Sequence, residues 1–181
     1  MDTAPSAGPG APDSALHRAK QPMNPAAGPY GHPFHPILVT VPIGAWVASL
    51  VFDIVAQAKT GDDVAVFAEG AYWLIGIGII GALLAALFGL MDFLGIERGT
   101  AAFKTGLTHL ALNLVVVALF VIDFVVRASE GRDDASTTGL VITIVALVLL
   151  GASGWLGGML AYRYGVRVAD EIHQSEGFRQ G

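Results

Sequence analysis

Hydrophobic residues are concentrated in four long segments that short polar segments separate. The apolar segments cover residues 37–58, 71–94, 107–126 and 140–161. At a rise of about 1.5 Å per residue, each is long enough as a helix to cross a hydrocarbon layer of about 30 Å. The connecting segments are so short that consecutive helices must pack antiparallel. The pattern therefore predicts an all-α membrane protein with four transmembrane helices in an up-down-up-down bundle.

A soluble four-helix bundle is the competing interpretation. Its helices would need a charged outer face, whereas residues 140–150 are apolar on every side. Charged residues make up 14% of the chain, and about 25% is usual in soluble domains. Both observations favour lipid, so we expect the lipid bilayer to be the main partner of the chain.

The first 30 residues have a different composition from the rest. They are rich in Ala, Pro, Gly and Ser, and eight of the nine prolines lie at or before Pro36. This density of proline predicts a disordered tail over residues 1–30, with no helix and no core. The tail contains no apolar stretch typical of a secretory signal. We expect the four-helix domain over residues 31–168 and a short tail over residues 169–181.

Basic residues predict the orientation in the membrane, because cytoplasmic loops carry an excess of Lys and Arg. The side that holds both termini collects seven of them, and the other side has three: Arg18, Lys20, Arg98, Lys104, Arg163, Arg167 and Arg179 against Lys59, Arg127 and Arg132. Both termini of this multi-pass protein are therefore expected in the cytoplasm, with the helices in the cell membrane. The net charge of -5 is modest and spread among loops, so nucleic acid is not an expected partner.

Stripes of small residues predict which helix faces pack inward, since small side chains let transmembrane helices approach closely. Three of the four apolar segments carry such a stripe at spacings of three or four residues: Ala45, Ser49 and Asp53; Gly81, Ala85, Gly89 and Asp92; Gly151, Gly154 and Gly158. We expect all three stripes to face the inside of the bundle.

Ionisable side chains at membrane depth are costly and so mark candidate functional sites. His109 and Asn113 lie one turn apart on the third helix, and Asp92 lies at a comparable depth on the second. A carboxylate near an imidazole fixes its tautomer and prepares the ring to hold a metal, a haem or a proton. The alternative is an interhelical hydrogen bond that only aligns two helices. Both interpretations stay open.

Two further histidines precede the first helix, in the segment Gly31-His32-Pro33-Phe34-His35-Pro36. The prolines keep this segment extended and hold His35 at the mouth of the bundle. If His32 and His35 converge with His109, the three imidazoles form a candidate site for haem or a metal ion, with the carboxylate and amide described above in support. The chain has no cysteine, so no thiolate completes such a site.

Two carboxylates lie toward the opposite ends of the helices. Asp53 and Asp123 fall near the ends of their segments, and Arg127 follows Asp123 by one helical turn. This spacing predicts an ion pair between Asp123 and Arg127 on one face of the third helix. Asp53 and Asp123 are also candidates for a proton or cation path.

Together these residues resemble an uncharacterised family of four-helix bacterial membrane proteins, domain of unknown function 2231 (DUF2231). The likeness covers roughly residues 31–168 and rests on the histidine-proline segment and on further scattered positions: Pro42, Ile43, Gly44, Asp53, Gly89, Asp92, His109, Asn113, Gly157, Gly158, Tyr162 and Gly165. Many members carry a further histidine where this chain has Thr40, so a site that needs that ligand is weakened here. Some relatives are joined to Rieske-type iron-sulfur domains, which implies electron transfer near a membrane and a membrane redox partner.

Three functions stay open at this point. The first is a redox-associated membrane protein in which the histidines bind haem or a metal. The second is a proton or small-solute permease that uses Asp92, His109 and Asp53. The third is an accessory subunit, without a ligand, that docks on a larger complex through its small-residue faces. The sequence contains no phosphate-binding loop, no nucleophile with a paired base and no transporter-like inverted repeat, so enzymatic activity is not expected.

Overall fold

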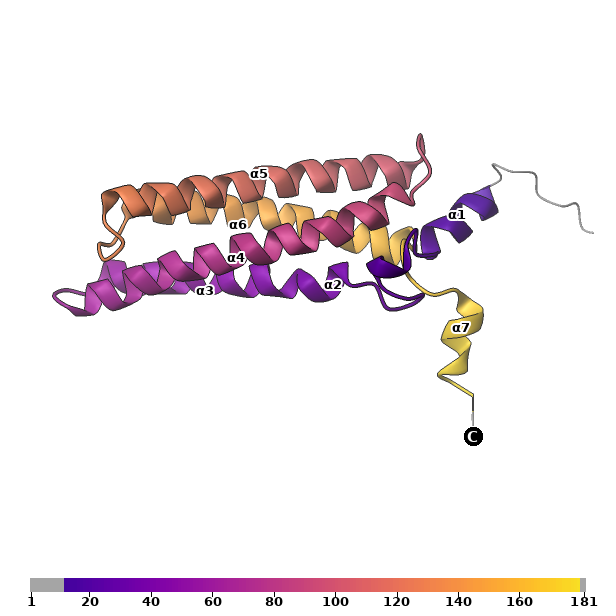
Figure 1. Cartoon of the computed structure of the whole chain (residues 1–181), viewed down its shortest axis with the longest axis horizontal. Helices are drawn as coiled ribbons and strands as arrows, with labels where there is room; N and C mark the ends of the chain where they lie inside the picture. The colour runs from indigo at the N-terminus through magenta and orange to yellow at the C-terminus, as the bar shows by residue number, and fades with distance from the viewer. Residues whose placement is uncertain (1–11, 180–181) are drawn as a thin grey trace, which may run out of the picture.

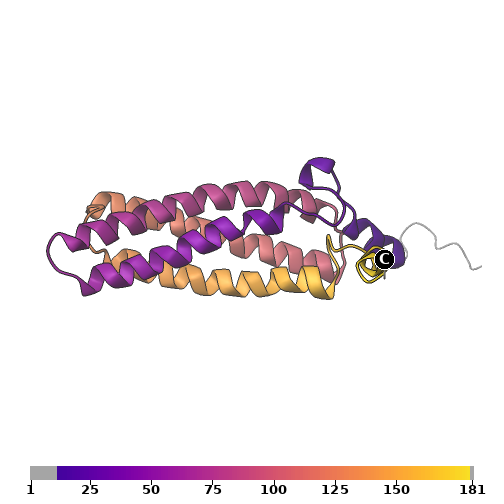
Figure 2. The same cartoon turned by 90° about the horizontal axis from the view of Figure 1, so that it is seen from below.

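Four long helices run side by side in the computed structural model, which describes residues 12–179 (Figure 1, Figure 2). They are α2 with α3 (His35–Leu38 and Thr40–Ala58), α4 (Asp63–Leu94), α5 (Ala101–Glu130), and α6 (Thr137–Gly158) with a π-helical turn, η2 (Met159–Arg163). Three short helices lie at one end: α1 (Pro12–Lys20), η1 (Pro25–Ala27) and α7 (Glu171–Glu176). The described residues contain no strand, and four helices are long and apolar enough to span a membrane. The predicted fold class is confirmed.

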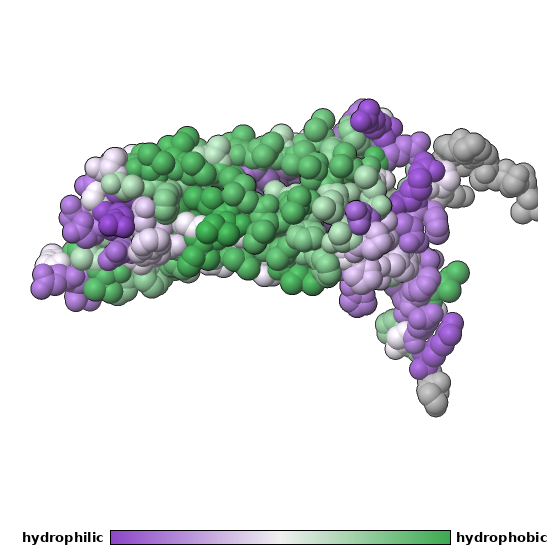
Figure 3. Space-filling model, viewed as in Figure 1, coloured by the Kyte–Doolittle hydropathy of each residue, from purple (hydrophilic) through white to green (hydrophobic). Residues whose placement is uncertain are grey.

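The surface of the bundle is apolar along its middle. In Figure 3 hydrophobic residues cover the central part of the molecule, and hydrophilic residues gather at its two ends. Each long helix exposes large aliphatic side chains there, among them Val47, Ile80, Val125 and Val148. An exposed apolar surface of this extent is unfavourable in water and matches hydrocarbon. The chain is therefore built as a membrane protein.

Local sequence determines where α5 and α6 begin. The hydroxyl of Thr100 accepts a hydrogen bond from the backbone N–H of Phe103, and that of Ser136 accepts one from the N–H of Gly139. Each hydroxyl satisfies a donor that has no partner within its own helix. Helix α5 ends at Glu130, and the residue that follows, Gly131, has a φ of +116°, a conformation that residues with side chains rarely adopt.

Contacts between the two hairpins, α3–α4 and α5–α6, recur at one spacing along the chain. Three pairs of residues that meet between them are each 74 positions apart: His35 with His109, Trp46 with Phe120, and Asp53 with Arg127. This constant spacing is typical of a parallel repeat rather than of the inverted repeats of many transporters. Two of the three pairs join different residue types, so the sequence alone did not reveal the spacing.

The middle of the bundle is a packed apolar core. The rings of Trp46 and Phe120 stack with their centroids 4.0 Å apart, and Ile75, Val116 and Ala146 are fully buried around them. The indole N–H of Trp46 donates to the backbone oxygen of Ile75 at 3.3 Å, so the core leaves this donor satisfied.

The small-residue stripes of α3 and α4 face inward as predicted, but the stripe of α6 does not. Gly151, Gly154 and Gly158 lie on the outer side of α6, with nothing within 4 Å of a side chain that they would carry. Buried positions of α6 include Thr143 and Ser153, which bond to polar groups of α5. In a bundle surrounded by lipid, polar groups of α5 need hydrogen-bond partners, and this need selects the inward face of α6.

The amino-terminal segment also differs from the prediction. Residues 12–20 form α1 and residues 25–27 form η1, so the expected absence of helix is wrong here, whereas residues 1–11 lie outside the described residues. Proline is compatible with these helices because Pro12 and Pro25 are their first residues, where the missing N–H is not needed.

This segment packs on the end of the bundle. Ala19 is buried against Ile96 and Val166, and the backbone N–H of Arg167 donates to the oxygen of Ala19 at 2.9 Å. Arg18 forms an exposed ion pair with Glu97 at 2.6 Å. We call this end, where α1 and α7 lie, the terminal end, and the opposite end the distal end (Figure 1). That the terminal end faces the cytoplasm stays a prediction.

Candidate functional site

His35 is the first residue of α2 and lies at the terminal end of the bundle. Its Nδ1 lies 2.8 Å from the backbone oxygen of Ala85 in α4. A carbonyl oxygen only accepts hydrogen bonds, so Nδ1 carries the proton and Nε2 carries the lone pair. The ring lies against Gly89, where an added Cβ would come within 2.8 Å of the ring carbon Cε1. Among residues 12–179, no group is bonded to Nε2 of His35.

His109 is held in the same way in the second hairpin. Its Nδ1 lies 2.8 Å from the backbone oxygen of Ser153 in α6, and its ring lies against Gly157, where a Cβ would be 3.1 Å from Cε1. The side-chain N–H of Asn113 lies 3.1 Å from Nε2 and donates to that nitrogen. His109 is therefore fixed as the same tautomer as His35, and its lone pair is engaged by Asn113.

The two imidazole rings lie close together, one contributed by each hairpin. Their centroids are 6.4 Å apart and their planes are perpendicular. Metal–nitrogen bonds of about 2.0–2.1 Å place the centres of two rings roughly 6 Å apart when the metal lies between them. The separation of the two ring centroids therefore lies in the range expected for two imidazole ligands of one metal.

The sequence suggested that Asp92 fixes the tautomer of a nearby histidine. In the structure, backbone carbonyls fix the tautomers of both His35 and His109 instead. The partner of Asp92 is Arg167 of the carboxy-terminal segment, with Nε and Oδ1 2.8 Å apart. Arg167 is buried, has a φ of +61°, and donates through Nη2 to the backbone oxygens of Ala27 and Gly28. The ion pair therefore fastens the terminal segments over the end of α4. No sequence spacing links Asp92 with Arg167, so the pair was missed.

His32 differs from the other two histidines in exposure. It is exposed and lies in the extended segment before α2, whereas His35 and His109 are half-buried. Within residues 12–179, no three side chains of His, Cys, Asp or Glu come together as a metal site. The expected three-histidine set is thus reduced to a pair, His35 and His109, with Asn113 beside it.

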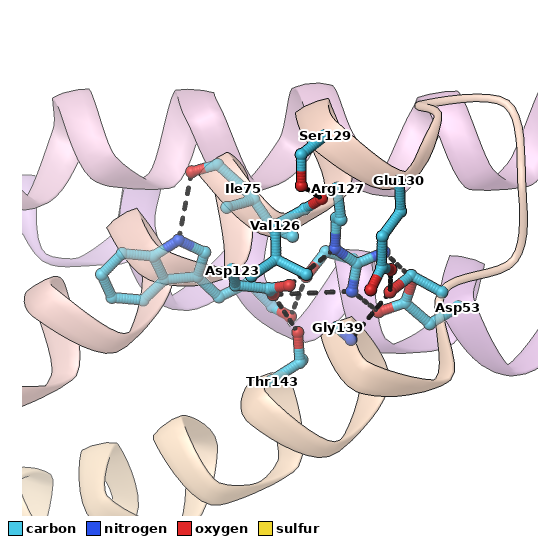
Figure 4. A network of polar contacts seen from close by, with 12 residues as sticks. Asp53, Ile75, Asp123, Val126, Arg127, Ser129, Glu130, Gly139 and Thr143 are labelled. Carbon is cyan, nitrogen blue, oxygen red and sulfur yellow. Dashed lines mark hydrogen bonds and ion pairs between the residues drawn. The ribbon is translucent and has the colours of Figure 1, made fainter.

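A second polar cluster lies toward the distal end (Figure 4). The predicted ion pair is confirmed, since Nε of Arg127 lies 2.8 Å from Oδ1 of Asp123. Asp53 of α3 completes the cluster by accepting bonds from Nη1 and Nη2 of Arg127 at 2.6 and 2.8 Å. Thr143 of α6 donates to Oδ2 of Asp123 at 2.8 Å. The sequence did not reveal that Asp53 and Thr143 join this ion pair, because they come from other helices.

This ionic cluster connects α3, α5 and α6 and is buried on all sides. The side chains of Asp53, Asp123 and Arg127 are 4%, 0% and 3% exposed. A Cβ on Gly139 would lie 2.6 Å from Nη2 of Arg127, so glycine is required at this position for the guanidinium to fit. Each charge has its opposite within hydrogen-bond distance, which is the condition for burying an ion without a large penalty. The cluster has the features of a structural connection between helices.

Comparison with curated proteins and with solved structures gives no match for this chain. A family model described as "Predicted membrane protein (DUF2231)" matches residues 31–170. This range begins at the histidine-proline segment and contains both polar clusters, all four long helices and Arg167. With four apolar helices long enough to span a bilayer and a family match over most of its length, the chain belongs to the DUF2231 family of predicted membrane proteins.

Proposed function

We propose that His35 and His109 bind one transition-metal ion between them, either as a bare ion or as the iron of a haem, and that the protein is a redox-associated membrane protein. The observation that carries this proposal is the pair of perpendicular imidazoles at 6.4 Å. Bis-imidazole ligation is the chemistry shared by both forms of the metal.

The hydrogen bonds of the two rings support this proposal. Metal-binding histidines donate their other ring N–H to a carbonyl or carboxylate, which orients the ring and leaves the second nitrogen as the ligand. Both Nδ1 atoms have such a carbonyl partner. The metal would displace the hydrogen bond from Asn113 to Nε2 of His109. Without a metal, the side-chain N–H of Asn113 satisfies the lone pair on Nε2 of His109.

Thr40, where the family resemblance leads one to expect a further histidine, adds no ligand to this pair. The hydroxyl of Thr40 donates to the backbone oxygen of Ile37 at 2.6 Å, and the residue is exposed. A threonine side chain carries a hydroxyl and no nitrogen, and here the hydroxyl already donates to the backbone. The site of this chain therefore depends on two histidines.

A permease receives less support from the geometry. The histidine pair and the ionic cluster lie toward opposite ends of the bundle, and the stacked rings of Trp46 and Phe120 fill the space between them. A proton or solute would have to cross this apolar core without a polar partner. Binding at one end therefore explains the histidines better than conduction through the bundle.

The test is a visible absorption spectrum combined with elemental analysis of the protein purified from membranes in detergent. We expect about one metal per chain, lost in His35→Ala and in His109→Ala. His32→Ala is the matched control, because this histidine is exposed and lies in the same segment as His35; it should retain the metal. A Soret band identifies haem, whereas metal without that band identifies a bare ion.

Two results would overturn the proposal. One is purified protein that contains neither haem nor metal and acquires neither when both are supplied. The other is a bound metal that persists at the wild-type level in both alanine variants, which would place it elsewhere in the chain.

A further inference from the structure

The outer face of α6 carries a groove toward the terminal end. Its floor is formed by Gly151, Gly154 and Gly158, at none of which an added Cβ would meet another atom within 4 Å. The groove has a volume of about 560 Å³, and the residues that line it besides these glycines are Trp155, Met159, Tyr162 and Arg163. Trp155 and Tyr162 are 76% and 92% exposed. In a bilayer this groove would face lipid.

The length of the groove corresponds to one leaflet of a bilayer. From Gly151 to Arg163 the helix advances by roughly 18 Å at about 1.5 Å per residue, and half of a hydrocarbon core of about 30 Å is roughly 15 Å. A transmembrane helix that packed on α6 would need a contact surface through both leaflets. An acyl chain occupies one leaflet only, so the groove fits a lipid better than a helix.

Arg163 places a positive charge at the end of the groove. It is the last residue of the π-helical turn and is exposed. Within residues 12–179 it forms an ion pair with no carboxylate, and its guanidinium lies 5.9 Å from the centroid of the Tyr164 ring. A guanidinium presents paired N–H donors that match the oxygens of a phosphate. The charge of the groove is therefore complementary to a phosphate group at the membrane surface.

We propose that this groove is a binding site for an anionic phospholipid, with its phosphate on Arg163 and one acyl chain over the three glycines. Trp155 and Tyr162 line the groove, and Tyr162, next to Arg163, lies at the end of the helix, where amphipathic aromatic rings are favoured at the membrane surface. The site belongs to the leaflet at the terminal end. It is independent of the histidine pair, because none of its lining residues contacts His35 or His109.

The experiment compares lipid retention by the purified full-length chain. The protein is reconstituted in bilayer discs of phosphatidylglycerol and phosphatidylcholine, extracted in mild detergent, and the bound lipid is identified by native mass spectrometry. The wild type should retain phosphatidylglycerol in preference to phosphatidylcholine. Arg163→Gln should lower this preference about fivefold, the effect typical of one basic residue at an anionic membrane surface.

Two matched controls separate this site from general effects. Arg98→Gln removes an exposed positive charge at the same end of the bundle but outside the groove, and it should leave retention unchanged. Gly154→Leu fills the groove, whereas Gly44→Leu adds the same side chain at an exposed glycine of α3 with open space around it. Only Gly154→Leu should release the lipid.

The proposal is wrong if Arg163→Gln retains phosphatidylglycerol as the wild type does, or if both leucine variants behave alike. It is also wrong if Gly154→Leu leaves lipid retention intact and instead separates a dimer into monomers, because the groove would then hold a second copy of the chain. Arg163→Gln changes an exposed side chain that, among residues 12–179, forms no ion pair and contacts only the Tyr164 ring, so its result does not depend on whether the leucine variants fold.

Discussion

Replacing Arg127 with methionine gives the most direct test of the ionic cluster. Methionine keeps an unbranched apolar chain but removes the guanidinium that Asp53 and Asp123 share at 2.6 and 2.8 Å. Both carboxylates are at most 4% exposed, so neither can be hydrated without opening the bundle. Removing one partner of a buried ion pair costs about 3–5 kcal/mol, because the remaining charge loses its compensation. We expect Arg127→Met to lower the free energy of unfolding by about this amount.

Reversible unfolding in mixed micelles measures this loss of stability. Two further variants serve as controls that show whether the loss comes from the buried charges. Lys59→Met removes an exposed ion pair with Asp63, whose atoms are 3.5 Å apart, and should cost less than about 1 kcal/mol. Changing Arg127 to methionine together with Asp53→Asn and Asp123→Asn leaves no charge in the site, so it should restore most of the lost stability. A loss below about 1 kcal/mol in Arg127→Met would refute the reasoning, since it would mean that water reaches the two carboxylates.

Two further predictions concern the core and the carboxy-terminal segment. Gly78→Ala should lower the free energy of unfolding by about 1–3 kcal/mol, because the new Cβ would collide with the indole of Trp46; Gly44→Ala, with open space around it, should cost little in the same assay. The hydrogen bond to the Asp170 carboxylate raises the pKa of His173 above its usual 6.5. Hydrogen bonds from the backbone N–H and then the ring of His173 lower the pKa of Asp170 to about 2. The stability that the protein gains from the raised pKa of His173 is fully present below about pH 6.5 and is lost as the pH rises through that pKa. The stability gained from the lowered pKa of Asp170 is present above about pH 3.8 and is lost as the pH falls toward 2. An NMR titration should show a His173 pKa above 6.5 that returns toward 6.5 in Asp170→Asn, and an unchanged value in that variant would contradict the assignment.

The membrane helices were predictable because each depends on its own composition. A segment of about 20 apolar residues favours hydrocarbon whatever the other segments do, and all four predicted segments lie within long helices of the structure. The ion pair between Asp123 and Arg127 was predictable for a related reason, since residues four apart on one helix always share a face. Both inferences use only spacing along one element.

The pairing of polar groups between elements was not predictable in this way. Asp92 meets Arg167, and Arg127 meets Asp53, through segments that are far apart in sequence. Which side chains meet depends on how far each helix is rotated about its own axis and on how the terminal segments fold back. The sequence identified Asp92 and Arg127 as residues of interest and left their full set of partners open.

The outward stripe of α6 illustrates the same limit. The spacing of Gly151, Gly154 and Gly158 is typical of a helix that packs closely on another, yet these residues face away from the bundle. The carbonyl of Ser153 and the hydroxyl of Thr143 turn the opposite face of α6 toward α5. Hydrogen bonds that lipid cannot replace outweigh close contact between small residues.

By itself the sequence determined that the chain crosses a membrane four times, since transfer into lipid is a property of each segment alone. The tertiary structure decided that His35 and His109 lie side by side, that residues 74 positions apart meet between the two hairpins, and that three glycines of α6 lie on the outer side of the bundle. These features depend on the relative rotation of helices, which the burial and pairing of polar groups along the whole bundle determine together.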